Sequence, residues 1–492
     1  MNKTHLEHEY GEGTVTLHGD PTGGTMLYAY CHGPHLLADT RPTALLDRVR
    51  RESLPLTVDP VAVTHFLTLG LVPMPGSIFR EIRVLGIGEQ LNFSRKADGW
   101  EMAHRQAFPY FAESSRQDEE PDPRRLMNLL TASVGQTLEG AESPLLMLSS
   151  GKDSTAIAAA LARLGRKDVR CLTFTADTDT DEDGDARVLC ARLGLKHEKI
   201  RIDQRQPLDA DALTDFFRHA PFPCADDCQI PYVAALRKAR GVDVVLDGSG
   251  NDVYMGHVPS RNDLRRARLR MPLPGVAGML ERIVPYATRA DQLLHDPVEH
   301  CFMQGLFRRR EVSRFYPDAG LDDGFKHPLL DAYHHHDIFD FRAFTRGRHY
   351  DQGSCAFKAL MACEAFGMRC RLPWCDAPII DYYFNLPRNM RFNDQSYTNK
   401  VQLRAMLRDE IQYRDQIIGK RYFQFNRVAF FIANRDRVYD EIVNCAYWER
   451  EPAERLLQAA YRRLSRNPRV GVALNAWFLL SGWLNHNRLI NV

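Results

Sequence analysis

The stretch Leu145–Leu161, which reads LLMLSSGKDSTAIAAAL, constrains the fold more than any other part of the chain. Its four leading apolar residues suit a buried strand, and the alanine-rich run at its end suits a helix. Between them lies a turn of small and hydroxyl-bearing residues, Ser149–Thr155. Small residues let the backbone approach an anion closely, and the first turn of a helix offers unpaired N–H donors at the positive end of its dipole. The sequence therefore predicts a phosphate-binding loop.

The side chains of this loop suit a polyphosphate that is held together with a metal ion. Hydroxyl groups and the Lys152 ammonium can donate to phosphate oxygens, and Asp153 can hold Mg²⁺ against them. The pattern is not the Walker loop, which needs Gly-Lys-Ser/Thr after a longer glycine-spaced loop. The candidate ligand-binding residues of the loop are Ser149, Ser150, Gly151, Lys152, Asp153, Ser154 and Thr155.

Beyond this loop, strand and helix patterns alternate. We predict helices over Pro123–Gly140, Ala186–Leu193 and Tyr232–Arg240, and strands over Leu145–Leu148, Val169–Phe174 and Val242–Leu246. Such alternation is typical of an α/β fold with a parallel sheet that has helices on both faces. Ligands bind beyond the carboxyl ends of such strands, where loops 149–155 and 247–252 would both emerge. Asp153 and Asp252, one from each loop, are therefore the candidate magnesium ligands.

The first 115 residues have a different pattern, with more strands. We predict strands over Thr14–Leu17 and Met26–Tyr30, a helix over Pro60–Leu69 and a short strand pair around Gly86–Gly88. The charged, proline-containing segment Glu113–Pro123 reads as a linker. We therefore predict a strand-rich domain over 1–115 and a second domain over 123–492. The last ninety residues of the second domain would be helices, with an apolar stripe near residues 472–484.

Length and composition exclude several classes of protein. A chain of 492 residues can bury at least two cores, and its formal net charge of +1 gives no overall attraction to nucleic acid or to a membrane. The start of the chain lacks an apolar signal core, and no window approaches ~18 apolar residues, so we expect a cytoplasmic protein. The eleven scattered cysteines fit reduced thiols, and Cys224 and Cys228 have no second pair nearby to complete a zinc site.

The phosphate loop resembles the Ser-Gly-Gly-x-Asp-Ser loop of enzymes that split ATP into AMP and pyrophosphate, with Ser150 in place of the first glycine. Further segments occur in the same order as in the synthetase domain of asparagine synthetases, and the resemblance covers most of 125–430. These segments are Leu172–Phe174, Asp181–Glu182, Leu193–His197, Ala220–Pro223, Leu246–Gly256, Arg371–Asp376 and Ile418–Phe425. The resemblance implies the parallel-sheet ATP-pyrophosphatase fold, which is adenine nucleotide α-hydrolase-like.

The same resemblance implies ATP and Mg²⁺ as cofactors and assigns further site residues. Leu148, Phe174 and Gly248 would line the adenosine site. Lys420 lies in the late segment that carries an essential lysine in this family, and it is the candidate catalytic residue for stabilising negative charge as an adenylate forms and collapses. Lys400 is the alternative for this role.

Part of the first 115 residues resembles the second half of a glutaminase domain and its linker, at Leu37–Asp39, Leu56–Pro60 and Gly70–Pro73. Glutaminases of this kind use a cysteine at the mature N-terminus as the nucleophile. This chain begins Met1-Asn2, its first cysteine is Cys31, and asparagine cannot supply a thiolate. We therefore expect a truncated glutaminase-like N-terminal domain that does not use glutamine.

The reaction expected from these residues is ATP-dependent amide-bond formation through an acyl-adenylate, with release of AMP and pyrophosphate and with an amine or ammonia as acceptor. Ser249 stands where asparagine synthetases have glutamate and β-lactam synthetases have tyrosine, and Val253 replaces an acidic residue. These changes suggest specialised, natural-product biosynthesis. The alternative is an intramolecular cyclase that forms a macrolactam or a lactam, as in lasso-peptide cyclases and β-lactam synthetases.

Two other classes fit less well. A sulfur-transfer or nucleotide-modifying enzyme acting on RNA would show catalytic cysteines and a basic face, and neither stands out. The other alternative is a degenerate protein that still binds nucleotide and serves as a scaffold. The substitutions at Ser150, Ser249 and Val253 favour this alternative. The expected partners are therefore small-molecule or peptide carboxylates and amines, without nucleic acid or membrane. The sequence leaves their identity and the oligomeric state open.

Overall fold

A five-stranded sheet lies at the centre of the predicted synthetase region. The computed structural model describes residues 8–11, 13–106, 119–176, 182–203, 205, 210–255, 283–320, 322–393, 395–396, 398–413 and 425–490. The sheet has the order β10-β9-β8-β11-β12, and every neighbouring pair is parallel. Its strands are β8 (Pro144–Met147), β9 (Arg170–Ala176), β10 (Lys196–Ile202), β11 (Val244–Leu246) and β12 (Arg369–Arg371). The predicted α/β class with a parallel sheet is confirmed.

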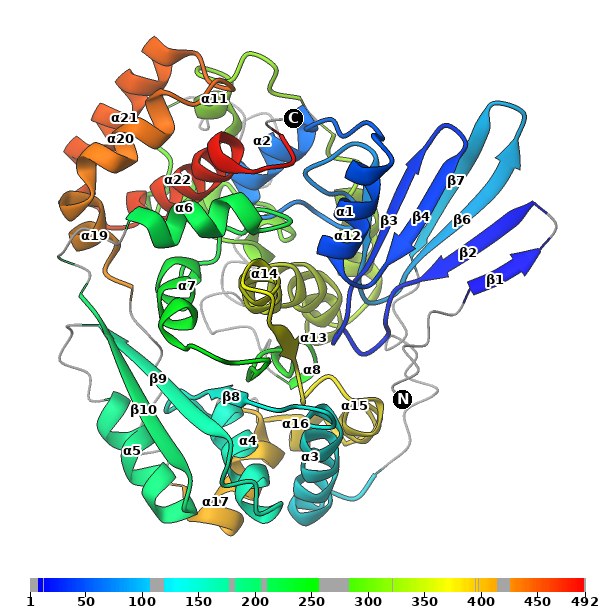
Figure 1. Ribbon diagram of the computed structural model, residues 1–492, viewed down its shortest axis with the longest axis vertical. Coiled ribbons are helices and arrows are strands. Elements are labelled where there is room, and N and C mark those ends of the chain that lie inside the picture. The colour runs from blue at the N-terminus through cyan, green and yellow to red at the C-terminus, as the bar shows by residue number, and fades with distance from the viewer. Residues whose placement is uncertain are drawn as a thin grey trace.

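Helices cover both faces of this sheet (Figure 1). Leu146 and Leu148 share one apolar cluster with α3 (Pro123–Thr137), α4 (Lys152–Arg163) and α17 (Val401–Ile411). Leu145 and Met147 share another cluster with α7 (Gln229–Lys238) and α14 (Phe357–Ala365). Successive side chains of a strand point to opposite faces, so a strand buried on both faces needs a continuous apolar run. This is why β8 was recognisable in the sequence.

Two antiparallel sheets form the N-terminal part. One has the order β1-β2-β6-β7 and the other the order β4-β3-β5. The strands are β1 (His8–Gly11), β2 (Thr14–His18), β3 (Leu27–His32), β4 (His35–Asp39), β5 (Ile82–Leu85), β6 (Glu89–Lys96) and β7 (Gly99–Gln106), and the helices are α1 (Pro42–Arg51) and α2 (Pro60–Leu69). The first two predicted strands correspond to β2 and β3, and α2 has the predicted bounds.

The predicted strand pair around Gly86–Gly88 is wrong in its pairing. Strands do flank this turn, but β5 pairs with β3, whereas β6 pairs with β2 and β7. The turn is pressed against the second half of the chain, because a Cβ on Gly86 would lie 2.5 Å from Gln352 Oε1. The turn therefore carries the chain from one sheet to the other instead of closing a hairpin.

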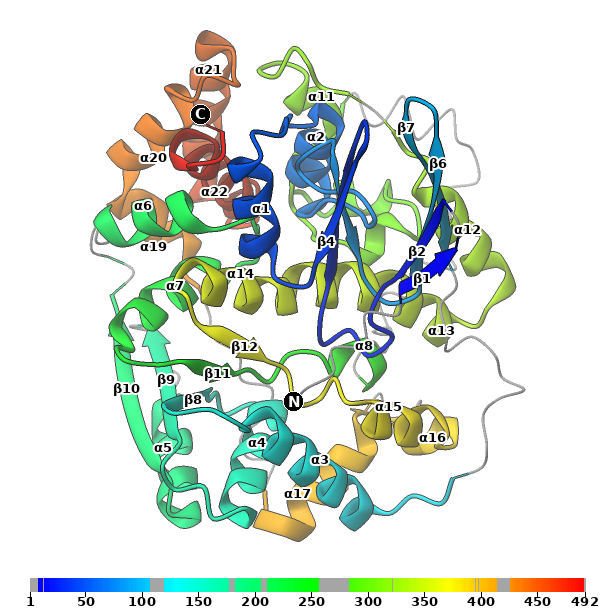
Figure 2. The ribbon, with the colours of Figure 1, turned by 45° about the vertical axis from the view of Figure 1, so that its right-hand side comes forward.

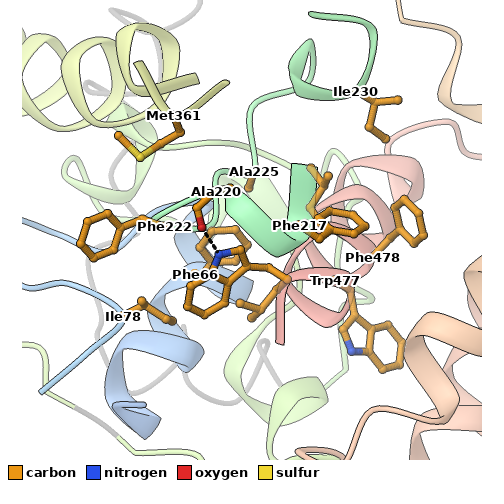
Figure 3. Packing of buried hydrophobic residues seen from close by; sticks show 14 of the residues in the cluster. Phe66, Ile78, Phe217, Ala220, Phe222, Ala225, Ile230, Met361, Trp477 and Phe478 are labelled. Atoms are coloured by element: carbon orange, nitrogen blue, oxygen red, sulfur yellow. Dashed lines mark hydrogen bonds between the residues drawn. The ribbon is translucent and has the colours of Figure 1, made fainter. Parts of the chain in front are cut away.

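One apolar core joins the N-terminal part to the C-terminal helices. Tyr28 stacks on Phe222 with 5.4 Å between the ring centroids, and Phe79 contacts Trp483 at 5.7 Å. Figure 3 shows Phe66 of α2 in the same cluster as Phe222 and Trp477. The C-terminal helices are α19 (Arg427–Ala433), α20 (Arg435–Val443), α21 (Arg450–Leu464) and α22 (Val470–His486). Because this core crosses the predicted boundary, the division into domains 1–115 and 123–492 stays a prediction.

A long helical segment separates the N-terminal sheets from the parallel sheet (Figure 2). It consists of the π-helix η4 (Ala343–Ala356), which continues directly into α14. The other described elements are α5 (Glu182–Leu193), α6 (Ala210–His219), α8 (Asp252–Met255), η2 (Asp291–Leu293), η3 (Glu299–Cys301), α11 (Arg309–Val312), α12 (Lys326–His335), α13 (Ile338–Arg342), α15 (Ala377–Phe384), α16 (Arg388–Arg391), β13 (Phe392–Asn393) and β14 (Thr398–Asn399). Within the described ranges, no helix is both long enough and apolar enough to span a membrane.

Candidate active site

The predicted phosphate loop closes on itself through its own hydroxyl groups. Ser154 Oγ accepts a hydrogen bond from the Ser149 N–H at 3.0 Å and lies 3.0 Å from Ser149 Oγ. Ser149 Oγ in turn accepts from the Gly151 N–H at 3.1 Å. From outside the loop, the Tyr413 hydroxyl donates to the Ser150 carbonyl at 2.7 Å. Helix α4 begins directly after Gly151, so the loop is fixed at the amino end of a helix, as predicted.

Two hydroxyl groups in this region have no partner. Ser150 Oγ and Thr155 Oγ1 are buried, and the described part of the chain gives neither a hydrogen bond. Buried polar groups are almost always paired, and an unpaired one costs about 1–3 kcal/mol. Orphaned hydroxyls at the amino end of a helix fit an anionic ligand that would complete their hydrogen bonds.

The second predicted loop, 247–252, packs directly against the first. A Cβ on Gly248 would lie 3.0 Å from the Ser154 backbone nitrogen, so glycine allows the closest approach of the two loops. The Asn251 amide donates to Asp153 Oδ1 at 2.5 Å. The two loops therefore meet at the carboxyl edge of the sheet, where the strand order requires them to emerge.

A buried lysine joins the two predicted metal ligands. Lys400 Nζ lies 2.8 Å from both carboxylate oxygens of Asp153 and 2.6 Å from Asp252 Oδ1. It also donates to Asn251 Oδ1 at 3.0 Å, and its side chain is only 5% exposed. Burial by itself lowers the pKa of Lys400, but the charges of Asp153 and Asp252 outweigh it and raise that pKa above its usual range. The amine is therefore a fixed positive charge.

The structure thus brings both predicted metal ligands to one ammonium group. No group of three His, Cys, Asp or Glu side chains suited to a metal occurs among the described residues. Mg²⁺ is usually held by one or two protein carboxylates together with substrate phosphates and water. Asp153 and Asp252 fit that requirement once phosphate oxygens are present, and the magnesium assignment stays a prediction.

The residues predicted to line an adenosine site lie on the same edge of the sheet. The Leu148 carbonyl accepts from the Thr173 hydroxyl at 2.9 Å, at the end of β8. Phe174, near the end of β9, is half-buried and meets the ring of Tyr232 edge-on at 6.2 Å. Together with Gly248 after β11, these residues lie at or near the ends of three adjacent strands. Their arrangement suits a nucleotide laid across the strand ends.

Comparison with known protein families shows which family this chain belongs to. The asparagine synthase family, as a sequence model, matches residues 125–474, which include both loops and Lys400. The chain belongs to the asparagine synthase family. Proteins with the provisional name glutamine-hydrolyzing asparagine synthetase, from Mycobacterium tuberculosis and Mycobacterium bovis, are 28% identical to it over 290 residues. The match covers 56% of this chain and 43% of each relative, so the chain spans less than half the length of these curated relatives.

Around Asp247, which follows β11, this asparagine synthase family chain has a polar cluster that the sequence did not reveal. Ser249 donates to Asp247 Oδ1 from its N–H at 2.8 Å and from its hydroxyl at 2.5 Å. The Tyr232 hydroxyl donates to Asp247 Oδ2 at 2.9 Å. Burial and the nearby Asp247 charge raise the pKa of Tyr232, so its phenol stays protonated. Ser249 therefore fixes the second loop.

A second buried lysine completes this cluster. Lys358 Nζ lies 5.4 Å from the centroid of the Tyr232 ring and 3.4 Å from Asp226 Oδ1. No sequence motif links the three residues of this cluster, which are Lys358, Asp226 and Tyr232. Only the tertiary structure brings them together, so no signal in the sequence could have found this cluster.

Other predicted residues are placed as follows. Lys420, the candidate catalytic lysine, lies outside the described residues. His197 Nε2 is hydrogen-bonded to the Thr173 hydroxyl at 3.0 Å, which is a packing role. Asp376 precedes α15, and burial raises the pKa of its carboxyl. The sequence missed Trp374, whose indole N–H donates to the Asp153 carbonyl at 3.1 Å and so holds the first loop.

Proposed function

We propose that this asparagine synthase family protein is an ATP-dependent carbon–nitrogen ligase that activates a carboxylate as an acyl-adenylate. The observation that carries the proposal is the contact of Lys400 with Asp153 and Asp252 at the mouth of the hydroxyl-lined loop. A buried cation between two carboxylates suits the recognition of a triphosphate, and the loop that carries Asp153 also holds the orphaned hydroxyls of Ser150 and Thr155.

An amine cannot displace an oxide directly from a carboxylate, so the carboxylate must first be given a better leaving group. A substrate carboxylate oxygen attacks the α-phosphorus of ATP, the bond to pyrophosphate breaks, and the acyl-adenylate forms. An amine then attacks the acyl carbon, the bond to AMP breaks, and the nitrogen loses a proton. Magnesium, when bound, supplies neutralisation of phosphate charge, and Asp153 and Asp252 would hold it. Leu148, Phe174 and Gly248 would position the adenosine.

In this proposal Lys400 has two tasks. It neutralises Asp153 and Asp252, which would otherwise repel each other and the nucleotide. It also presents its ammonium to phosphate oxygens, where charge develops as pyrophosphate departs. Lys420 keeps the role at the adenylate that the sequence assigns to it, and Lys400 is proposed to act on the phosphate oxygens.

The proposed fold is the ATP-pyrophosphatase type over 123–492, preceded by a truncated glutaminase-like domain over 1–115. Cys31 is the only cysteine in the first 115 residues, and it lies within β3. Burial raises the pKa of its thiol, the opposite of what a nucleophilic thiolate needs. This supports ammonia or a substrate amine, and not glutamine, as the nitrogen source. Natural-product biosynthesis remains part of the proposal.

The test is an ATP–pyrophosphate exchange screen over a panel of carboxylic acids, followed by mass spectrometry with candidate amines. The expected result is exchange that depends on one class of acid, with AMP as the nucleotide product. Loss of one water within a single substrate would identify the cyclase alternative. Formation of ADP and phosphate in place of AMP and pyrophosphate would refute the proposal.

A further inference from the structure

A loop of the N-terminal part reaches the candidate site. We call residues 20–25 the Asp20 loop. Asp20 Oδ1 accepts from the Thr22 N–H at 2.8 Å and from the Thr22 hydroxyl at 2.6 Å, and Asp20 Oδ2 accepts from the Thr25 N–H at 2.9 Å. The Gly23 N–H also donates to the Asp20 carbonyl at 3.1 Å. One carboxylate therefore fixes the shape of the whole loop.

The Asp20 loop contacts the helix that carries Asp252. The Tyr254 hydroxyl donates to the Thr22 carbonyl, and Tyr254 lies only two residues beyond Asp252 in α8. A Cβ on Gly23 would lie 3.3 Å from the same hydroxyl. Gly23 has a φ of 73°, a conformation that favours glycine. The position of α8 thus depends on the N-terminal part.

Cys375 fills the space between the Asp20 loop and the second loop. A Cβ on Gly24 would lie 2.8 Å from Cys375 Cβ, and a Cβ on Gly250 would lie 2.3 Å from Cys375 Sγ. Glycine on both sides leaves no spare volume around this side chain. A shift of the Asp20 loop is therefore transmitted to Gly250, which precedes Asn251 and Asp252.

The neighbouring residue extends this contact to the first loop. Trp374 is fully buried, and its indole N–H donates to the Asp153 carbonyl at 3.1 Å. The dipeptide Trp374-Cys375 therefore touches the first loop, the second loop and the Asp20 loop at once. Asp153 and Asp252, the two carboxylates on Lys400, are both tied to this junction.

We propose that the Asp20 loop braces the nucleotide site, so that the N-terminal part sets the separation of Asp153 and Asp252 through Cys375, Trp374 and Tyr254. These three are positioning residues, because they act through the two aspartates. The inference rests on the proposed function, since the ligand is the triphosphate of ATP. It gives the N-terminal part a role in the ligase that does not involve glutamine.

The main test is Gly24→Ala in the full chain. The φ of Gly24 lies outside the left-handed region, so alanine fits the backbone, but its methyl group would push Cys375 toward Gly250. We expect the Kd for Mg-ATP to rise at least about tenfold, while the Kd for AMP changes by less than about twofold. AMP binding would depend on Leu148, Phe174 and Gly248, and Gly248 packs against Ser154 of the first loop. Isothermal titration calorimetry measures both constants.

Four further variants make the test specific. Adding Cys375→Gly to Gly24→Ala removes the obstructing side chain, so the double variant should recover to within about threefold of Cys375→Gly alone. Tyr254→Phe removes the hydroxyl bonded to Thr22 without adding volume, and it should weaken Mg-ATP binding and spare AMP binding. Gly135→Ala in α3 is the matched control, because its new methyl group would meet only Leu164, at 3.8 Å.

The outcomes separate this inference from the proposed function. If the wild-type chain binds neither Mg-ATP nor AMP, the proposed function itself fails. If the wild-type chain binds both ligands and Gly24→Ala and Tyr254→Phe bind Mg-ATP with the wild-type Kd, the brace is overturned. Equal weakening of Mg-ATP and AMP binding in folded variants would also overturn it, because that pattern indicates a general loss of structure. If Gly24→Ala does not fold, Tyr254→Phe decides the question by the same two constants.

Discussion

At the scale of single residues, Lys400 is the main electrostatic feature of the site. Its ammonium is nearly buried and lies within 2.8 Å of Asp153 and 2.6 Å of Asp252. Because two carboxylates share this ammonium, the loss of one of them leaves the other to compensate its charge. We therefore expect Lys400 to affect both the stability of the site and the binding of phosphate that we propose for it.

Replacing Lys400 with methionine should reduce ATP–pyrophosphate exchange by about 10²–10³, the scale of losing one transition-state charge donor. The matched control is Lys326→Met. Lys326 is also a mostly buried lysine between two carboxylates, with its Nζ 2.7 Å from Glu299 and 3.3 Å from Asp296. Its loss should lower stability and leave exchange per folded molecule unchanged. Equal effects of the two substitutions on exchange would show that Lys400 is only structural.

Asp153→Asn tests the metal assignment. The amide keeps an oxygen that can accept from Asn251, so the fold should be retained, but the charge that would hold Mg²⁺ is lost. We expect a large fall in exchange and a higher magnesium requirement, with an unchanged circular dichroism spectrum. Near-normal exchange in this variant would refute a metal role for Asp153.

At the scale of elements, the signals that predicted well were local. The predicted helix over Pro60–Leu69 has the observed bounds, and at its start the Asp59 carboxylate accepts from the Val61 N–H at 3.0 Å while Pro60 occupies the first turn. The sequence missed β10, whose burial alternates only weakly, and β12, which has three residues. Both lie at edges of the sheet, where hydrogen bonds to one neighbour define the strand and no continuous apolar run marks it.

Asp59→Ala should lower the free energy of unfolding by about 1 kcal/mol, because it removes the side-chain cap of α2. Urea denaturation followed by circular dichroism measures this change. Asp59→Asn is the conservative control, since asparagine also caps helices, and it should recover most of the loss. A stability of Asp59→Ala equal to that of the wild type would mean that packing alone holds the start of α2.

His65 in α2 should make stability depend on pH. Burial lowers its pKa, and a hydrogen bond with the backbone of Asp322 and the charges of Asp323, Asp322 and Asp59 only partly offset this. The fold therefore favours neutral histidine, whereas the unfolded chain takes up a proton below about pH 6.5. The contribution of His65 to the free energy of unfolding is therefore fully present above about pH 6.5. It is lost as the pH falls toward the lowered pKa of His65 in the folded protein.

The measurement is the free energy of unfolding from about pH 7.5 to about pH 5. Below about pH 6.5 the wild type should lose up to about 1.4 kcal/mol per pH unit more than His65→Leu, which cannot titrate. Parallel curves for the two proteins would show that His65 takes no part in this dependence.

At the scale of the whole molecule, the continuous core has a consequence for truncation. Tyr28, Phe66 and Phe79 from the N-terminal part are buried in the same cluster as Phe222 and Trp483. A chain beginning at residue 119 would expose the apolar surface that these residues cover. We expect it to aggregate or to bind the dye ANS. Cooperative unfolding of residues 119–492 alone, at the melting temperature of the full chain, would contradict this expectation.

Reasoning from the sequence alone predicted the strand, turn and helix over Leu145–Leu161, the parallel sheet and the candidate pair Asp153 and Asp252. Each depends on signals within a few residues, such as the run Leu145–Leu148, the hydroxyl-rich turn and the helix start after Gly151. Three contacts could be found only in the folded chain: Lys400 lies between Asp153 and Asp252, Lys358 lies over Tyr232, and Cys375 lies between Gly24 and Gly250. These contacts join residues up to about 350 positions apart, as between Gly24 and Cys375. Their geometry is fixed by packing of the whole chain and not by any local preference.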